Sequence, residues 1–219
     1  MTRGRTVATR AGSGRRDDER KGLSAVIATT HSIFGVAALA GAGLALGVEP
    51  PVWAYPVAAV AAWLPDVDNP RSRLGNGLSR RRNPLANAVT RPVSWALRAA
   101  SFGLFRTVGH RTLTHSLLGL LLFCLPVYLL LGFSPALQLA LVAGVVSHVA
   151  ADALNTWGVP LLWPVRKNFR LVPGGVRSGG AAEFIVAGLM VAVSAYALFE
   201  VHPAIGRTLG FGLPPLPLF

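Results

Sequence analysis

Five apolar stretches, separated by prolines, glycines and charged residues, limit what this chain can fold into. They are Leu23–Gly47, Val52–Leu64, Thr112–Gly132, Pro135–Ala153 and Ala181–Val201. All but Val52–Leu64 approach the roughly 20 residues that a helix needs to cross a bilayer. The chain is 52% hydrophobic and only 14% charged, which is too apolar for an ordinary soluble domain. We therefore predict an all-α fold, a polytopic membrane helix bundle of about five spans.

The segment Arg71–Arg111 predicts one further helix of a different kind. It carries nine arginines around the helical sequence LANAVTRPVSWALRAASFGLF. Arg91 and Arg98 are seven residues apart with Trp95 between them, a spacing that repeats on one side of a helix. Such a helix can lie in the headgroup region of a membrane. A helix in a soluble loop is the alternative.

The two ends of the chain differ from the middle. Residues 1–22 are basic and polar, and we expect a disordered cytoplasmic tail. Residues 202–219 are rich in proline and glycine, and we expect no regular structure there. The membrane-embedded functional domain is then residues 23–201. The basic tail has no aromatic residues on which bases could stack, so nucleic acid is not the expected partner.

The basic residues predict the orientation in the membrane. If all five stretches cross the bilayer, 20 of the 21 lysines and arginines fall on one side, and only Arg207 falls on the other. By the positive-inside rule the basic side is cytoplasmic. We expect a multi-pass membrane protein, with the N-terminus inside and the C-terminus outside.

Most of the histidines and acids near these stretches fall at the same cytoplasmic level. His148 and Asp152 lie four residues apart, on one face of a helix, at the end of Pro135–Ala153. Ionisable groups at membrane depth are costly and usually functional. The candidate metal ligands are His31, Asp66, Asp68, His110, His115, His148, Asp152 and Glu183.

Taken singly, these residues have structural alternatives. His31 could hydrogen-bond between helices, and Glu183 could interact with a helix dipole. Thr114 could cap the helix that follows it. Asp66 and Asp68 could belong to a turn, although in an extended turn both could reach inward. Their convergence at one level favours a metal site over these separate explanations.

This ligand set suits zinc, manganese or iron, with one ion or two. A metal ion with an open position makes hydroxide available near neutral pH, so hydrolysis is the simplest chemistry to expect. The nearby arginines could hold an anionic, phosphate-containing substrate, and membrane lipids are expected partners. A metal or anion transporter and a non-catalytic, metal-stabilised membrane scaffold are the alternatives.

Four sequence blocks resemble a known family. They are Leu64–Pro70 (LPDVDNP), Gly109–Ser116 (GHRTLTHS), Ser147–Asp152 (SHVAAD) and Gly158–Pro164 (GVPLLWP). In their order and spacing they resemble the YdjM family, bacterial inner-membrane proteins described as LexA-regulated and as metal-dependent hydrolases. The resemblance runs from about residue 29 to about residue 183. It implies zinc as the first expectation for the metal.

A more distant similarity concerns the order of the ligands. The order His, Asp, His and then HxxxD is similar to that of the zinc phospholipase C and P1 nuclease enzymes, which cleave phosphoesters. This similarity implies that Asp152 bridges two metal ions. It implies ligands at His31, Asp66 or Asp68, His110 or His115, His148 and Asp152. We expect catalytic roles for Asp152, Asp68 and Arg111, with Arg111 in contact either with the substrate or with a metal ligand.

Overall fold

The computed structural model describes residues 28–69, 72, 84–109, 112–130, 134–165 and 167–202. Within this part of the chain every regular element is a helix, as predicted, and β-bridges occur only singly. The predicted tail at residues 1–22, His110 and Arg111 lie outside the described residues. The helices are Ala28–Leu46, α2 (Ala54–Ala61), the 3-10 helix η1 (Leu64–Asp68), α4 (Pro84–Thr107), the 3-10 helix η2 (Leu113–His115), α5 (Leu117–Leu130), α6 (Pro135–Ala153) and α7 (Ala181–Val201).

Three of the described helices are long and apolar enough to cross a membrane: Ala28–Leu46, α6 and α7. Helices α6 and α7 have the bounds that the sequence predicted. The two other predicted spans are shorter. Helix α2 has 8 residues before the chain turns into η1, and α5 has 14. Five full spans are therefore not confirmed.

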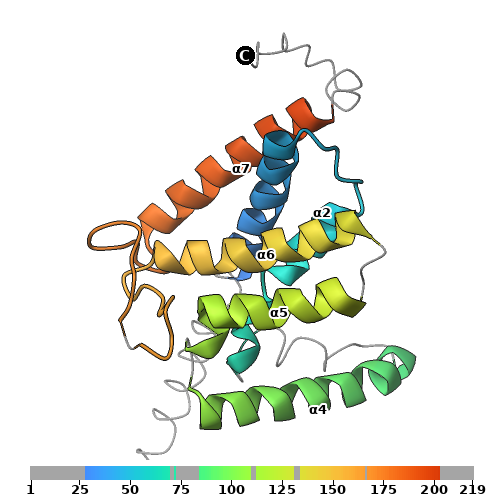
Figure 1. Ribbon diagram of the computed structural model, residues 1–219, viewed down its shortest axis with the longest axis vertical. Helices are drawn as coiled ribbons and strands as arrows, with labels where there is room; N and C mark the ends of the chain where they lie inside the picture. The colour runs from blue at the N-terminus through green and yellow to red at the C-terminus, as the bar shows by residue number, and fades with distance from the viewer. Residues whose placement is uncertain are drawn as a thin grey trace, which may run out of the picture.

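Helix α6 is the centre of the bundle. Half of the residues in its most apolar part are buried inside the bundle, against 33% for Ala28–Leu46 and 11% for α7. It packs along α2 and α5, with α7 and the first helix crossing on the far side from α5 (Figure 1). Contact with α2 is close because Gly35 and Gly144 both face the backbone at Ala58. A Cβ at either glycine would overlap the Ala58 carbonyl oxygen. These glycines fix the position of α2 between its two neighbours.

Helix α4 forms within the segment for which an extra helix was predicted. It buries Ser94 and Ser101 and packs against η1. Aromatic side chains such as Trp95 and Phe102 remain exposed, and the Arg106 guanidinium lies 5.2 Å from the centre of the Phe102 ring. This mixture of exposed aromatic and basic groups suits a helix at a membrane surface, which stays a prediction.

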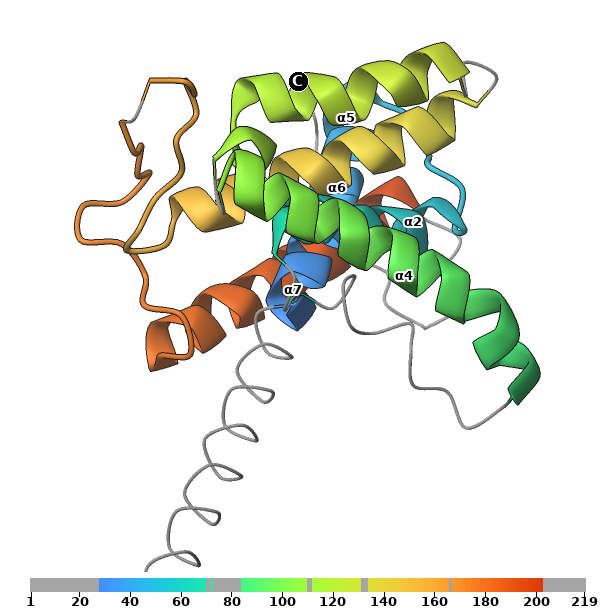
Figure 2. The ribbon, with the colours of Figure 1, turned by 90° about the horizontal axis from the view of Figure 1, so that it is seen from below.

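The loop between α6 and α7 returns to the end of α6. The amide of Leu171 donates to the carbonyl of Ala153 (2.8 Å), and that of Val176 donates to Leu154 (2.7 Å). These bonds satisfy carbonyls that the end of a helix leaves open. Gly175 has a φ of +65°, and a Cβ there would overlap the backbone of Thr156. The loop therefore lies close against the end of α6, at one end of the bundle (Figure 2).

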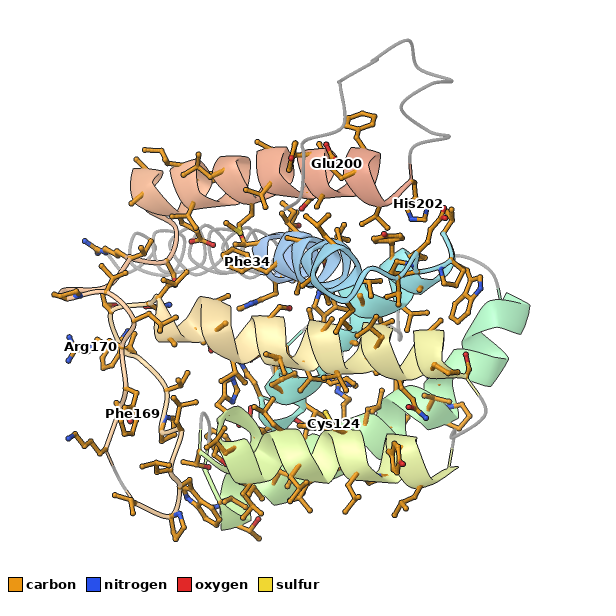
Figure 3. The ribbon with its side chains drawn as sticks, turned by 45° about the horizontal axis from the view of Figure 1, so that its top comes forward. Phe34, Cys124, Phe169, Arg170, Glu200 and His202 are labelled. Carbon is orange, nitrogen blue, oxygen red and sulfur yellow. The ribbon has the colours of Figure 1, made fainter. Side chains whose placement is uncertain are left out.

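His202 lies at the opposite end of the bundle from Arg170 of this loop (Figure 3). Its Nε2 is 3.0 Å from the Tyr55 hydroxyl, and its Nδ1 is 2.6 Å from a carboxylate oxygen of Glu49. His202 has no regular secondary structure, as predicted, but these two contacts hold its side chain in place. A buried polar side chain needs partners, and these two tie the end of α7 to α2. His202 is thus a structural histidine, remote from the others.

Candidate metal centre

Three segments bring four side chains together beside the C-terminal half of α6. Asp66 comes from η1, His115 from η2, and His148 and Asp152 from successive turns of α6. The Nε2 atoms of His115 and His148 are 3.1 Å apart. Oδ2 of Asp152 lies 3.3 Å from Nε2 of His115 and 3.7 Å from Nε2 of His148. Oδ1 of Asp66 lies 3.9 and 4.0 Å from the same two nitrogens.

These separations fit a divalent cation bound between the two imidazole nitrogens and a carboxylate oxygen. In a tetrahedral zinc site, metal–ligand bonds of about 2.0–2.1 Å set neighbouring ligand atoms about 3.4 Å apart. The separations above scatter around that value. Two imidazole nitrogens and two carboxylate oxygens are also a donor set that zinc and manganese accept. The cluster can therefore hold a metal ion after small shifts of its side chains.

The backbone fixes the orientation of the His148 ring. Its Nδ1 is 2.6 Å from the carbonyl oxygen of Ala62, just after α2. A carbonyl only accepts, so Nδ1 carries the proton and Nε2 keeps its lone pair for a metal ion. The close packing of α2 on α6 at Gly144, one turn before His148, places this carbonyl.

A hydroxyl fixes the His115 ring in a similar way. Thr114 donates its hydroxyl proton to Oδ2 of Asp68 at 2.6 Å. Its oxygen can then accept from Nδ1 of His115, which is 2.9 Å away. Nε2 of His115 is thereby left facing the cluster. The buried Asp68 thus acts on His115 through Thr114, the arrangement by which outer carboxylates orient metal ligands.

His31 lies on the other side of His148. The two rings stack with centroids 4.0 Å apart, and Nε2 of His31 is 3.8 Å from Oδ1 of Asp152. Its Nδ1 is buried and, among the described residues, has no hydrogen-bond partner. A buried nitrogen without a partner costs free energy unless a water, ion or ligand reaches it. His31, His148 and Asp152 form a second group in which one ion could bind.

The structure brings five of the predicted ligands together: His31, Asp66, His115, His148 and Asp152. The prediction of an extended turn for Asp66 and Asp68 is wrong. They lie on the 3-10 helix η1, where residues two apart point in different directions, so Asp66 reaches the cluster and Asp68 reaches Thr114.

Two further expectations can be compared with the structure. The carboxylate of the buried Glu183 accepts from the Thr30 hydroxyl (2.9 Å) and from the amide of Gly179 (2.6 Å). It is not in either candidate metal group of the described residues. Ser116 caps α5 by accepting from the amide of Gly119, so Thr114 does not have that role.

Sequence reasoning missed the Ala62 carbonyl that binds His148 and the hydrogen bond from Thr114 to Asp68, because neither contact has a sequence pattern of its own.

A small cavity of about 40 Å³ adjoins His31 and Asp152. Asn155, Ser178 and Glu183 contribute polar atoms to its wall. Asn155 is held in place by a hydrogen bond of 2.6 Å from its amide nitrogen to the Ser178 hydroxyl. The cavity therefore lies against one side of the cluster, next to the loop that follows α6.

Replacing Thr114 by valine is expected to weaken metal binding without removing a ligand. The change breaks the connection between Asp68 and His115 and frees the His115 ring to rotate. The metal dissociation constant should rise by about 10- to 100-fold, measured by competition with a fluorescent chelator. Thr107→Val is the matched control, because the exposed Thr107 hydroxyl bonds only to carbonyls of its own helix. Equal affinity in the two variants would contradict the positioning role of Thr114.

The fold and the cluster define a class: a helical membrane protein with a buried His/Asp site at one end of its bundle. A family model described as "YdjM inner membrane protein" matches residues 26–203. The chain belongs to the YdjM inner membrane protein family.

Individual relatives agree with this assignment. Inner membrane protein YdjM of Escherichia coli (strain K12) is 38% identical over 120 residues, 53% of this chain and 52% of that protein. YdjM of Shigella flexneri matches equally. The chain thus spans about half the length of these two relatives. The uncharacterized protein YvsG of Bacillus subtilis (strain 168) is 30% identical over 79% of this chain and 95% of its own length. No solved structure matches the chain.

Proposed function

We propose that this protein is an integral membrane hydrolase that depends on a divalent metal ion and cleaves a phosphoester. One observation carries the proposal: the Nε2 atoms of His115 and His148 lie 3.1 Å apart, and carboxylate oxygens of Asp152 and Asp66 lie 3.3 to 4.0 Å from both of them. Zinc is the first expectation and manganese the second. The His31 nitrogen and the small cavity beside Asp152 leave room for a water on one side of the cluster.

The reaction follows from these groups. A divalent cation held by Asp66, His115, His148 and Asp152 would supply a water activated for attack at neutral pH. The water oxygen forms a bond to phosphorus, the ester P–O bond breaks, and the leaving oxygen takes a proton to become an alcohol. The second carboxylate oxygen of Asp152, which faces His31, is placed to accept the proton that the water loses. Asp68 has a positioning role in this scheme.

The charge around the site supports an anionic substrate. The loop after α6 carries the exposed residues Arg170 and Arg177, and Arg177 precedes Ser178 of the cavity wall. Arginine binds phosphate oxygens through paired N–H groups. Arg111 remains a predicted substrate contact outside the described residues. Because the basic loops favour the cytoplasm, the proposed site faces the inner leaflet, with the N-terminus inside and five crossings in all.

The proposal is tested with purified protein in detergent, loaded with zinc or manganese. It predicts cleavage of bis-p-nitrophenyl phosphate or of phospholipid headgroups. In His115→Ala the rate should fall by about a hundredfold or more, since a ligand is lost. His202→Ala is the matched control, because it removes a buried histidine from the opposite end of the bundle. A fully metal-loaded protein that cleaves none of these compounds would refute the hydrolase assignment and favour a metal-stabilised scaffold.

The scaffold is the one alternative with an observation in its favour. Four protein ligands around one zinc ion are typical of closed structural sites. In that case removing the ion should lower the unfolding temperature, and no phosphoester should be cleaved. A transporter would need polar groups near mid-membrane, whereas the candidate ligands of the described residues gather at one end of the bundle.

A further inference from the structure

An apolar groove of about 430 Å³ runs between the first helix, α6 and α7. On the first helix its wall includes Phe34, Ala38 and Ala42, spaced so that they share one face. Figure 3 shows Phe34 on the part of that helix that lies between α6 and α7. The small alanine side chains are the reason that the groove is open, since larger residues at these positions would fill it.

The groove has the length of one leaflet. On α6 its lining extends from Leu139 to Ala150, which at 1.5 Å per residue is roughly 16 Å. This is about half of the 30 Å hydrocarbon core of a bilayer. An extended chain advances about 3.5 Å for every three bonds, so roughly 14 carbons cover the distance. The dimensions thus match one acyl chain of a lipid in a single leaflet.

The groove meets the proposed site at its end. Phe34 lines both the groove and the polar cavity that holds His31 and Asp152. On α6, the groove residue Ala150 is followed directly by Ala151 and Asp152 of the cavity. The groove therefore adjoins the cavity beside the metal cluster, with Phe34 between them.

The environment of the groove indicates what kind of molecule binds in it. The groove lies among the three helices that are long and apolar enough to span a membrane, so lipid tails are what surround it. At the end with the cavity, Arg170 and Arg177 offer positive charge for a phosphate. From the adjacency of groove and cavity we infer that the substrate is a membrane lipid phosphoester. One of its acyl chains lies in the groove, and its phosphate reaches the cluster.

This inference rests on the proposed hydrolase function, and it makes acyl-chain length a determinant of binding. Ala42 lines the groove eight residues beyond Phe34, away from the cavity. Ala42→Phe should shorten the groove, whereas Val142→Ala should widen it without crowding the bundle. Ala192→Phe is the matched control, because Ala192 is exposed on α7 and is not part of the groove lining.

The experiment uses the full chain in vesicles that contain phosphatidic acids with acyl chains shorter than, equal to and longer than the groove. Two quantities are measured for each variant. One is the crosslinking of a phosphatidic acid with a photoactivatable group at the end of its acyl chain, mapped by mass spectrometry. The other is phosphate release. Ala42→Phe is expected to reduce crosslinking and cleavage of the matching lipid by about tenfold and to shift preference to shorter chains. Val142→Ala should shift the preference to bulkier or branched chains, and Ala192→Phe should change neither.

The outcomes separate the inference from the function on which it rests. Crosslinks that depend on Ala42 in a protein that cleaves no phosphoester would uphold the lipid groove and refute the hydrolase. Cleavage of water-soluble and lipid phosphoesters without any dependence on chain length or on Ala42 would overturn the groove and keep the hydrolase. A change of oligomeric state in Ala42→Phe with unchanged crosslinks would overturn it too, since the groove would then be an interface between two copies.

Discussion

The variant His148→Ala is expected to lose its bound metal ion altogether. His148 belongs to both groups that could hold an ion, and only its Nε2 is available because Nδ1 bonds to Ala62. Affinity should fall by more than about a hundredfold, beyond the effect of losing an outer-shell partner. Metal content per chain after dialysis, measured by inductively coupled plasma mass spectrometry, tests this directly.

A comparison with His31→Ala shows how many ions bind. His31 belongs to one of the two groups, so Asp66, His115 and His148 remain in that variant. A wild-type content of two ions that falls to one in His31→Ala would place the second ion beside His31. His202→Ala should keep the wild-type content. If His148→Ala retained as much metal as the wild type, the cluster could not be the metal site.

The second large effect is expected from Gly144→Ala. The added Cβ would overlap the Ala58 carbonyl oxygen, so α2 and α6 have to move apart. Overpacking of this kind costs about 1–3 kcal/mol. The same movement takes the Ala62 carbonyl away from His148, so metal affinity should fall as well. Both effects are measured on one sample, as the unfolding temperature in detergent and the metal content.

The matched control for this variant is Gly41→Ala. A Cβ at Gly41 has no atom within 4 Å, and the position is inside the helix Ala28–Leu46. Alanine is favoured over glycine in a helix by about 1 kcal/mol, so this variant should be as stable as the wild type or more stable. Equal unfolding temperatures for Gly144→Ala and Gly41→Ala would show that the packing of α2 on α6 is looser than we describe.

Sequence reasoning predicted the long helices well and the short elements poorly. Helices α6 and α7 were placed to the residue, because apolar runs of that length leave a helix as the way to satisfy the backbone in lipid. The sequence predicts a short span at Val52–Leu64, tilted or partly unwound, and in the structure the segment divides into the short α2 and the start of η1. Apolar composition alone did not show where this helix stops.

The candidate site was predicted in the same uneven way. That His148 and Asp152 point the same way followed from their spacing on a helix. The sequence also predicted that His31 and His115 lie near them, because both histidines fall at the cytoplasmic ends of predicted spans. The different roles of Asp66 and Asp68 did not follow, because they depend on the 3-10 turn of η1 and on the neighbouring Thr114. The link of His202 to Glu49 and Tyr55 joins residues about 150 positions apart, which no local pattern reveals.

The sequence by itself determined that this protein is helical, that it belongs in a membrane and that its candidate metal ligands collect at one end. Each of these depends on a periodicity or a polarity that a single segment carries. Only the tertiary structure decided which side chains point into the candidate metal site and which hold its ligands in place from outside. The direction of a side chain is set by the packing of one helix on another, here by the contact of Gly144 with α2 and by the carbonyl of Ala62 that this contact delivers to His148.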